Sequence, residues 1–144
     1  MLTADNLQHM LSVARKCYKL ARAGDYSEED ARDVFLMGLL HDIGKEFNHD
    51  NHALTSYEML KHFTESENFE FYLNSIELHG QACEKCSTFQ DMLNYADMTT
   101  MPDGSPTSLD NRLSEIKERY GSDSDVYHEC VKLSYYLKSI LEEN

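Results

Sequence analysis

The chain has 144 residues, of which 41% are hydrophobic, six are glycine and two are proline. This length suits one domain that buries its own core, and the scarcity of turn-forming residues favours helices over a turn-rich β fold. Twenty-six acidic residues against 13 basic ones give a formal charge of -13, which opposes binding to nucleic acid and to anionic membrane surfaces. A small phosphorylated substrate stays compatible with this charge, because a bound divalent cation dominates its own neighbourhood.

From the sequence we expect neither a signal peptide nor a membrane span. No stretch reaches the roughly 18 consecutive apolar residues of a membrane span, and the N-terminal MLTADNLQHML lacks the pattern of a signal peptide. We therefore expect a cytoplasmic protein in which Cys17, Cys83, Cys86 and Cys130 are reduced. Cys83 and Cys86 form a CxxC pair, but a closed zinc site needs two more ligands, so we interpret them as loop thiols.

Apolar residues recur with helical spacing along the chain, and period-two alternation is absent. The first helix is predicted over residues 5–23 and ends at Gly24. Its inward stripe is predicted to be Leu7, Leu11, Ala14, Tyr18 and Ala21. Ser27 is predicted to cap a second helix that ends at the HDIGK segment, residues 41–45. The inward stripe of this helix is Ala31, Val34, Phe35, Gly38 and Leu39.

Further helices are predicted after the polar loop EFNHDN. The third carries Ala53, Leu54, Tyr57 and Leu60, and the next three begin at the caps Ser66, Ser87 and Ser108. MPDGSP, residues 101–106, is the strongest loop signal, and Gly121 closes the sixth helix. A last helix carries Val126, Cys130, Leu133, Leu137 and Ile140. The predicted fold is an all-α bundle of about six or seven helices without a sheet.

The dipeptide His41-Asp42 is the first candidate for chemistry. It follows the apolar run FLMGLL, and two strongly polar side chains at the end of a buried helix need partners. Imidazole and carboxylate are good ligands for a borderline divalent metal. A second copy, His49-Asp50, lies in a polar loop where solvent satisfies it, so we interpret it as a surface feature.

His9 and Asp97 extend this candidate site. His9 is placed in the first helix, flanking the apolar stripe beside Val13, and Asp97 follows Leu93 and Ala96 in the fifth helix. Alone, each has an ordinary interpretation, as a hydrogen-bonded core histidine and a solvated aspartate. Together with His41-Asp42, they supply polar groups from three helices, and bundle metal sites are built in this way.

The order His, His-Asp, Asp resembles the HD-domain superfamily of metal-dependent phosphohydrolases. The similar segments are HMLSVARKCYKLA at 9–21, FLMGLLHDIGK at 35–45, YADMTT at 95–100 and PDGSPTSLDNRLSEIKERYG at 102–121. The resemblance implies one all-α HD domain over residues 1–144, with its core motifs in 5–121 and an additional C-terminal helix in 122–144. It also implies that His9, His41, Asp42 and Asp97 bind a metal.

Four further residues are candidates: His52 and His79 through the resemblance, and Lys45 and Arg112 through their positive charge. His52 and His79 would hold a second ion with Asp42 bridging, although His52 also suits a helix cap and His79 a backbone contact at a helix end. Lys45 would act in catalysis by neutralising phosphate oxygens, but it also suits an exposed lysine after a glycine. Arg112 is a second candidate for contact with the phosphate of a substrate.

The implied activity is hydrolysis of a small phosphoester, best matched by a nucleotide, through a metal-activated water, with Asp42 both ligating and taking up a proton. Manganese, iron, cobalt, nickel or zinc suits an imidazole-rich site of one or two ions better than magnesium. No nucleic-acid or membrane partner is expected, and a homodimer is compatible with the sequence. The alternatives are a non-catalytic ligand-binding or scaffold protein with a structural metal, and an interaction module without metal.

Overall fold

The computed structural model describes residues 4–42, 74–80 and 88–142. Within these ranges every regular element is a helix, and the β contact is an isolated bridge between Thr100 and Pro106. The predicted all-α class is therefore confirmed. No helix in the described part of the chain has both the length and the apolar character of a membrane span.

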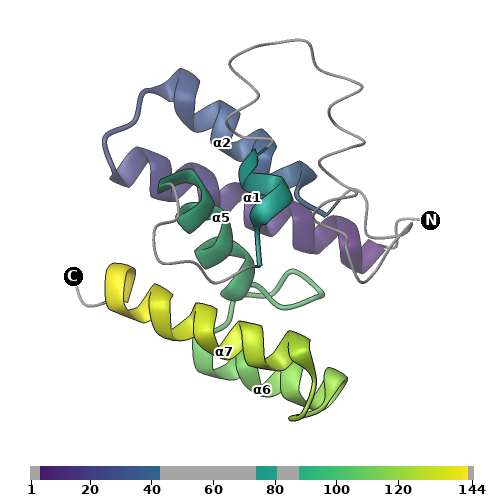
Figure 1. Ribbon diagram of the computed structural model, residues 1–144. Coiled ribbons are helices and arrows are strands. Elements are labelled where there is room, and N and C mark those ends of the chain that lie inside the picture. The colour runs from purple at the N-terminus through teal and green to yellow at the C-terminus, as the bar shows by residue number, and fades with distance from the viewer. Residues whose placement is uncertain (1–3, 43–73, 81–87, 143–144) are drawn as a thin grey trace.

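The first two helices form a side-by-side pair. Helix α1 spans Ala4–Ala23 and helix α2 spans Glu28–Leu40 (Figure 1). As predicted, Ser27 caps α2, because its hydroxyl accepts a hydrogen bond from the Asp30 backbone N–H at 3.1 Å. Acidic residues fill the first turn of α2, where the helix dipole favours negative charge.

The second half of the described chain contains helix α5, Thr88–Met98, helix α6, Leu109–Tyr120, and helix α7, Asp125–Leu137. Ser108 caps α6, and Gly121, at φ 92°, ends it by donating its N–H to the Lys117 carbonyl. Both ends of α6 were predicted from these two residues. Helix α7 continues into a short π-helix, Lys138–Glu142.

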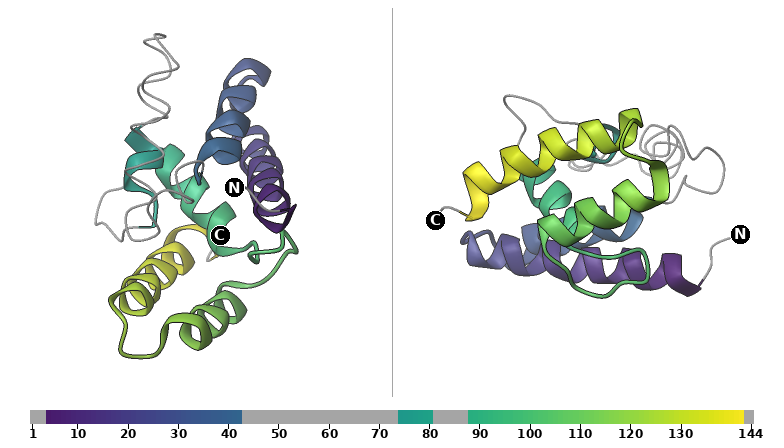
Figure 2. Two further views of the ribbon diagram at one scale, coloured as in Figure 1. Left: turned by 90° about the vertical axis from the view of Figure 1, so that its right-hand side faces the viewer. Right: turned by 90° about the horizontal axis from the view of Figure 1, so that it is seen from below.

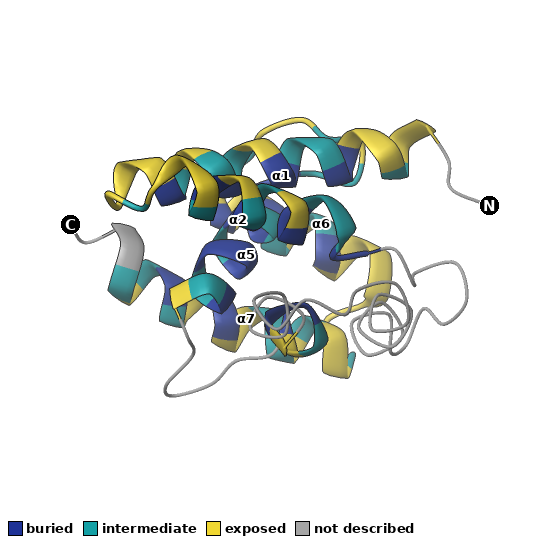
Figure 3. Cartoon of the chain, turned by 90° about the horizontal axis from the view of Figure 1, so that it is seen from above, coloured by how far each residue is buried: buried dark blue, intermediate teal, exposed yellow. Residues whose placement is uncertain are grey.

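Helix α5 lies between the α1–α2 pair and the α6–α7 pair, as Figures 1 and 2 show, and contacts α1, α2 and α7. Two hydrophobic clusters follow from this position, and Figure 3 shows the buried residues as dark blue stretches of the helices. The first cluster joins α1, α2, α5 and Ile76. The second cluster joins the end of α5 to α6 and α7 through Met98, Leu109, Ile116, Leu133 and Leu137.

The predicted inward stripe of α1 is partly wrong. Leu7 is 51% exposed, and the buried face instead includes Met10, Val13 and Cys17, with Ala14 and Ala21 as predicted. The buried face is the one that packs against α2 and α5, and it is rich in small side chains. In α7, Val126 is likewise exposed rather than inward.

A glycine sets the distance between α1 and α2. A Cβ atom on Gly38 would lie 2.9 Å from the Cα of Ala14 and 3.0 Å from the Sγ of Cys17. No side chain fits in such a gap, so the two backbones approach as closely as a glycine permits. This contact brings the end of α2, with His41 and Asp42, beside His9 in the first half of α1.

Candidate metal centre

Four polar side chains meet at the junction of α1, α2 and α5. His9 comes from α1, His41 is the C-cap of α2, Asp42 follows it, and Asp97 comes from α5. Each offers one possible ligand atom, and these atoms all lie within 4.8 Å of one another. His9, His41 and Asp42 are buried, and the Asp97 side chain is 17% exposed. The structure thus brings together the four residues selected from the sequence.

His9 lies on the buried face of α1, not on its flank as the sequence analysis expected. Its Nδ1 donates to the carbonyl of Met101 at 2.9 Å, and its Nε2 lies 2.8 Å from Oδ1 of Asp97. The Oδ2 atom of Asp42 is 3.6 Å from the same nitrogen. His9 therefore connects the start of the chain to both carboxylates of the cluster.

The loop 101–106 positions the Met101 carbonyl. Gly104 has φ +92°, and a Cβ atom there would lie 2.7 Å from the backbone carbon and oxygen of Gln8, the residue before His9. Only glycine combines this dihedral angle with this close approach. The sequence predicted the loop but not its role. The group that accepts the hydrogen bond from His9 is a backbone carbonyl, which no residue type identifies.

His41 is fully buried at the end of α2. Its Nδ1 donates to the Gly38 carbonyl at 2.6 Å. Its Nε2 is 3.1 Å from Oδ2 of Asp42 and 3.3 Å from Oδ1 of Asp97, yet forms no hydrogen bond of good geometry with any described residue. A buried ring nitrogen aimed at two carboxylates without such a bond fits a place for a cation.

His79 lies on the other side of Asp42. It follows the helical residues 74–78 and is buried. Its Nδ1 donates to the Ile76 carbonyl at 2.6 Å, and its Nε2 is 3.5 Å from Oδ1 of Asp42. Asp42 thus presents one oxygen to His79 and the other to His9 and His41.

Two side chains of α5, missed by the sequence analysis, support the segment that carries His79. Oδ1 of Asn94 accepts a hydrogen bond from the Gly80 N–H at 2.7 Å, and Nε2 of Gln90 donates to the Leu78 carbonyl at 3.1 Å. Gln90, Asn94 and Asp97 share one face of α5 at helical spacing. The helical spacing of these three polar residues is the sequence signal that could have identified Gln90 and Asn94 as supporting residues of the cluster.

The three imidazoles follow one pattern. Each bonds Nδ1 to a backbone carbonyl, and because a carbonyl only accepts, Nδ1 carries the hydrogen in each ring. Nε2 then faces the carboxylates. Metal-ligating histidines are oriented by such contacts of the second ring nitrogen. The donor set of imidazole nitrogens and carboxylate oxygens therefore fits a divalent metal.

The charges of the cluster are strongly coupled. Burial lowers the pKa of His41, but the Asp42 and Asp97 carboxylates outweigh burial, so that its pKa lies well above the ordinary value. Burial raises the pKa of Asp97, but His41 and His9 outweigh it and hold this pKa well below the ordinary value. The raised pKa of His41 favours a proton on its Nε2 in the absence of a metal, at a place that a cation would take.

Besides His79, the remaining residues selected from the sequence lie outside the described residues or on α6. Lys45, His52, Cys83 and Cys86 lie outside the described residues, as do the segments predicted to form the third helix and most of the fourth. Arg112 is buried on α6 and pairs with Glu115 of the same helix. Its contact with phosphate stays a prediction.

Comparison with known proteins agrees with this arrangement. The family model of the HD domain matches residues 6–133, a range that includes His9, His41, Asp42 and Asp97 and reaches into α7. No curated protein and no solved structure matches the chain. Because the matched range covers most of the sequence and the whole cluster, the chain belongs to the HD-domain superfamily.

Proposed function

We propose that the protein is a metal-dependent phosphohydrolase that acts on a small phosphoester, with a nucleotide as the preferred candidate. HD domains are generally metal-dependent hydrolases. The observation that carries the proposal is the cluster in which His9, His41, Asp42 and Asp97 bring their possible ligand atoms within 4.8 Å of one another. These four residues are the proposed ligands.

A divalent cation bound there supplies Lewis acidity, which polarises a phosphoryl oxygen and lowers the pKa of water towards about 7. Manganese, iron, cobalt, nickel and zinc suit the mixed nitrogen and oxygen donors better than magnesium. The chain's own contribution is orientation. The carbonyls of Gly38 and Met101 fix the rings of His41 and His9, so that little reorganisation accompanies binding.

Asp42 has two roles in the proposal. One oxygen faces His9 and His41, and the other lies 3.5 Å from Nε2 of His79. The side facing His79 is the proposed place for a second ion, with His52 as a further ligand. Where one ion is bound, the Asp42 oxygen facing His79 is positioned to take up a proton from attacking water. Lys45 and Arg112 are proposed to contact the phosphate oxygens of the substrate.

The depth of the cluster supports one alternative. The side chains of His41 and Asp42 are only 0% and 8% exposed, which also suits a structural metal in a non-catalytic ligand-binding or scaffold protein. The two functions share the ligands and differ in turnover. A protein that holds metal stoichiometrically and hydrolyses no phosphoester would favour the alternative.

The test combines metal analysis of the purified full-length protein with hydrolysis of a panel of phosphomonoesters and phosphodiesters, each assayed with several divalent metals. The variant is Asp42→Asn, which keeps the shape of the side chain and removes its charge. Asp123→Asn, at an exposed position, is the matched control. We expect Asp42→Asn to lose metal and nearly all activity while the control retains both. Full metal content and activity in Asp42→Asn would refute the assignment.

A further inference from the structure

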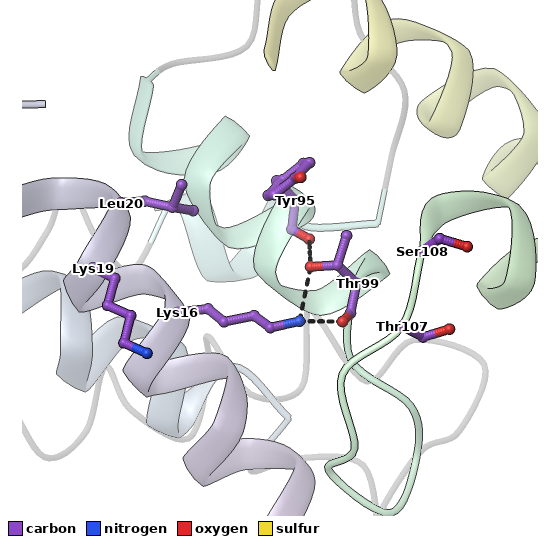
Figure 4. Close-up of a pocket in the computed structure, with 7 residues that line it drawn as sticks. All are labelled: Lys16, Lys19, Leu20, Tyr95, Thr99, Thr107 and Ser108. Atoms are coloured by element: carbon purple, nitrogen blue, oxygen red, sulfur yellow. Dashed lines mark hydrogen bonds between the residues drawn. The ribbon is translucent and has the colours of Figure 1, made fainter. Parts of the chain in front are cut away.

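A second candidate site lies where the second half of α1 contacts the end of α5, apart from the metal cluster. A pocket of about 320 Å³ lies between α1, the end of α5 and the start of α6 (Figure 4). Its lining contains two lysines and several hydroxyl groups but no carboxylate: Lys16, Lys19, Leu20, Tyr95, Thr99, Thr107 and Ser108. None of the four residues of the metal cluster lines it, so this pocket is separate from the candidate metal centre.

The pocket lies against the most positive segment of an acidic protein. Residues 6–24 contain Arg15, Lys16, Lys19 and Arg22 and no Asp or Glu, whereas the whole chain has a formal charge of -13. Basic groups gathered on one helix, in a chain that is otherwise strongly acidic, form a local positive field. That field attracts small anions to this face of α1.

The two lysines lack anionic partners among the described residues. Nζ of Lys16 donates to the carbonyl and to the hydroxyl of Thr99, the latter at 3.1 Å, and both are neutral acceptors (Figure 4). Lys19 forms no hydrogen bond or ion pair with any residue that the structure describes. Burial, together with the neighbouring charge of Lys19, lowers the pKa of Lys16. An anion between them would relieve this unfavourable arrangement.

The start of α6 adds to the same preference. Ser108 caps this helix of 12 residues, and its hydroxyl accepts a hydrogen bond from the Asn111 backbone N–H. The first backbone N–H groups of a helix have no intrahelical acceptor and lie at the positive end of its dipole. Ser108 and Thr107 place this helix end at the pocket, opposite the lysines. Helix N-termini with nearby lysines are suited to bind phosphate groups.

We propose that this pocket binds a phosphate group, held by Lys16 and Lys19 on one side and by the start of α6 on the other. His9 and Lys16 are seven residues apart on α1, which places them two turns apart on nearly the same face, a rise of about 10 Å. The phosphate therefore has two possible sources. It is either a distal phosphate of a molecule that also reaches the metal centre, or a separate anion.

Amide chemical shifts of the isotope-labelled full-length protein test the proposal, because they report where a ligand binds. We expect inorganic phosphate to shift the amides of Thr99, Thr107 and Leu109 in metal-free protein. A nucleoside diphosphate, added to metal-loaded protein, separates the sources. If the amides of the pocket and those around His41 move with one midpoint, the phosphate is distal on a single ligand. If they move with different midpoints, the pocket binds a separate anion.

The variants are Lys19→Met, which alters an exposed side chain and leaves the fold intact, and Lys16→Arg, which keeps the charge. Lys132→Met removes one charge from the exposed face of α7 and is the matched control. We expect Lys19→Met to weaken phosphate binding about tenfold or more, and Lys16→Arg and the control to retain most of it. The proposal is overturned if phosphate shifts no pocket amide in the wild type, or if Lys19→Met binds phosphate as the wild type does.

Discussion

Nδ1 of His41 donates a hydrogen bond of 2.6 Å to the carbonyl of Gly38, the residue whose missing side chain lets α2 approach α1. One glycine therefore sets both the spacing of the two helices and the orientation of a proposed metal ligand. Because His41 is completely buried, its ring has no room to adopt a second orientation. Changes at Gly38 should reach the metal centre without touching any of its ligands.

The first prediction concerns Gly38→Ala. The new methyl group would meet the Cα of Ala14 and the Sγ of Cys17 at about 3 Å. We therefore expect the free energy of unfolding to fall by about 1–3 kcal/mol. Metal affinity should fall as well, because α2 must move away from α1. Gly24→Ala is the control, since its added Cβ would make only ordinary contacts. Chemical denaturation and metal titration measure both effects, and equal behaviour of the two variants would contradict the prediction.

The second prediction concerns Gly104 and has a close control in the same chain. Gly104 and Gly121 both have φ +92°, but a Cβ atom would meet Gln8 only at Gly104 and would meet nothing within 4 Å at Gly121. Alanine at either position should cost about 1–3 kcal/mol through backbone strain. Gly104→Ala should cost more, and it alone should weaken metal binding, because the Met101 carbonyl would leave His9. Unchanged metal affinity in Gly104→Ala would show that this carbonyl is dispensable.

The third prediction is the pH dependence of the metal-free protein. The raised pKa of His41 gives stability that is complete below the ordinary value of 6.5 and is lost as pH rises through the raised value. The lowered pKa of Asp97 gives stability that is complete above 3.8 and is lost as pH falls through the lowered value. We therefore expect both contributions in full between about pH 4 and 6.5, and a decline on the alkaline side.

Metal affinity should change with pH in the opposite direction, because the cation and the proton on Nε2 compete for the same place. Thermal unfolding in chelator, followed across pH 4 to 9, measures the first effect, and metal titration at the same pH values measures the second. Asp97→Asn should flatten the stability profile. Parallel pH profiles for the wild type and Asp97→Asn would count against the coupled cluster.

The fourth prediction concerns thiol reactivity. Burial and the charge of Asp97 raise the pKa of Cys17, and burial raises the pKa of Cys130 to about 11. Since the thiolate is the reactive form, both should react slowly with an alkylating reagent at pH 8 in the folded protein. Replacing Cys83 and Cys86 with serine leaves only these two thiols to be counted. Mass spectrometry should show both labelled after denaturation, and rapid labelling of native Cys17 would disagree with its burial.

Local signals in the sequence predicted the ends of the helices well. Ser27, Ser108 and Gly121 mark helix ends through contacts within one turn, so residue identity was sufficient. The convergence of His9, His41, Asp42 and Asp97 was predicted from their order on separate helices and the resemblance to HD domains. The agreement reflects the strong need of buried polar groups for partners.

Contacts between distant segments were harder to predict. The inward face of α1 was assigned from the helical spacing of apolar residues, which put Leu7 inside, whereas close packing on Gly38 buries Cys17 together with the correctly predicted Ala14. The Met101 carbonyl could not be recognised either, because every residue carries a carbonyl and only the path of the loop selects this one. Long-range packing, rather than side-chain chemistry, decided both features.

The bond between His9 and Met101 joins residues separated by 92 positions in the sequence. A nascent chain that ends before α5 contains three of the four proposed ligands but not the aspartate and the carbonyl that complete the arrangement around His9. Closing so large a loop is a late event in chain assembly. A cation would consequently be captured after α1, α2 and α5 have come together, and would fasten α1 to α5 instead of nucleating the first helices.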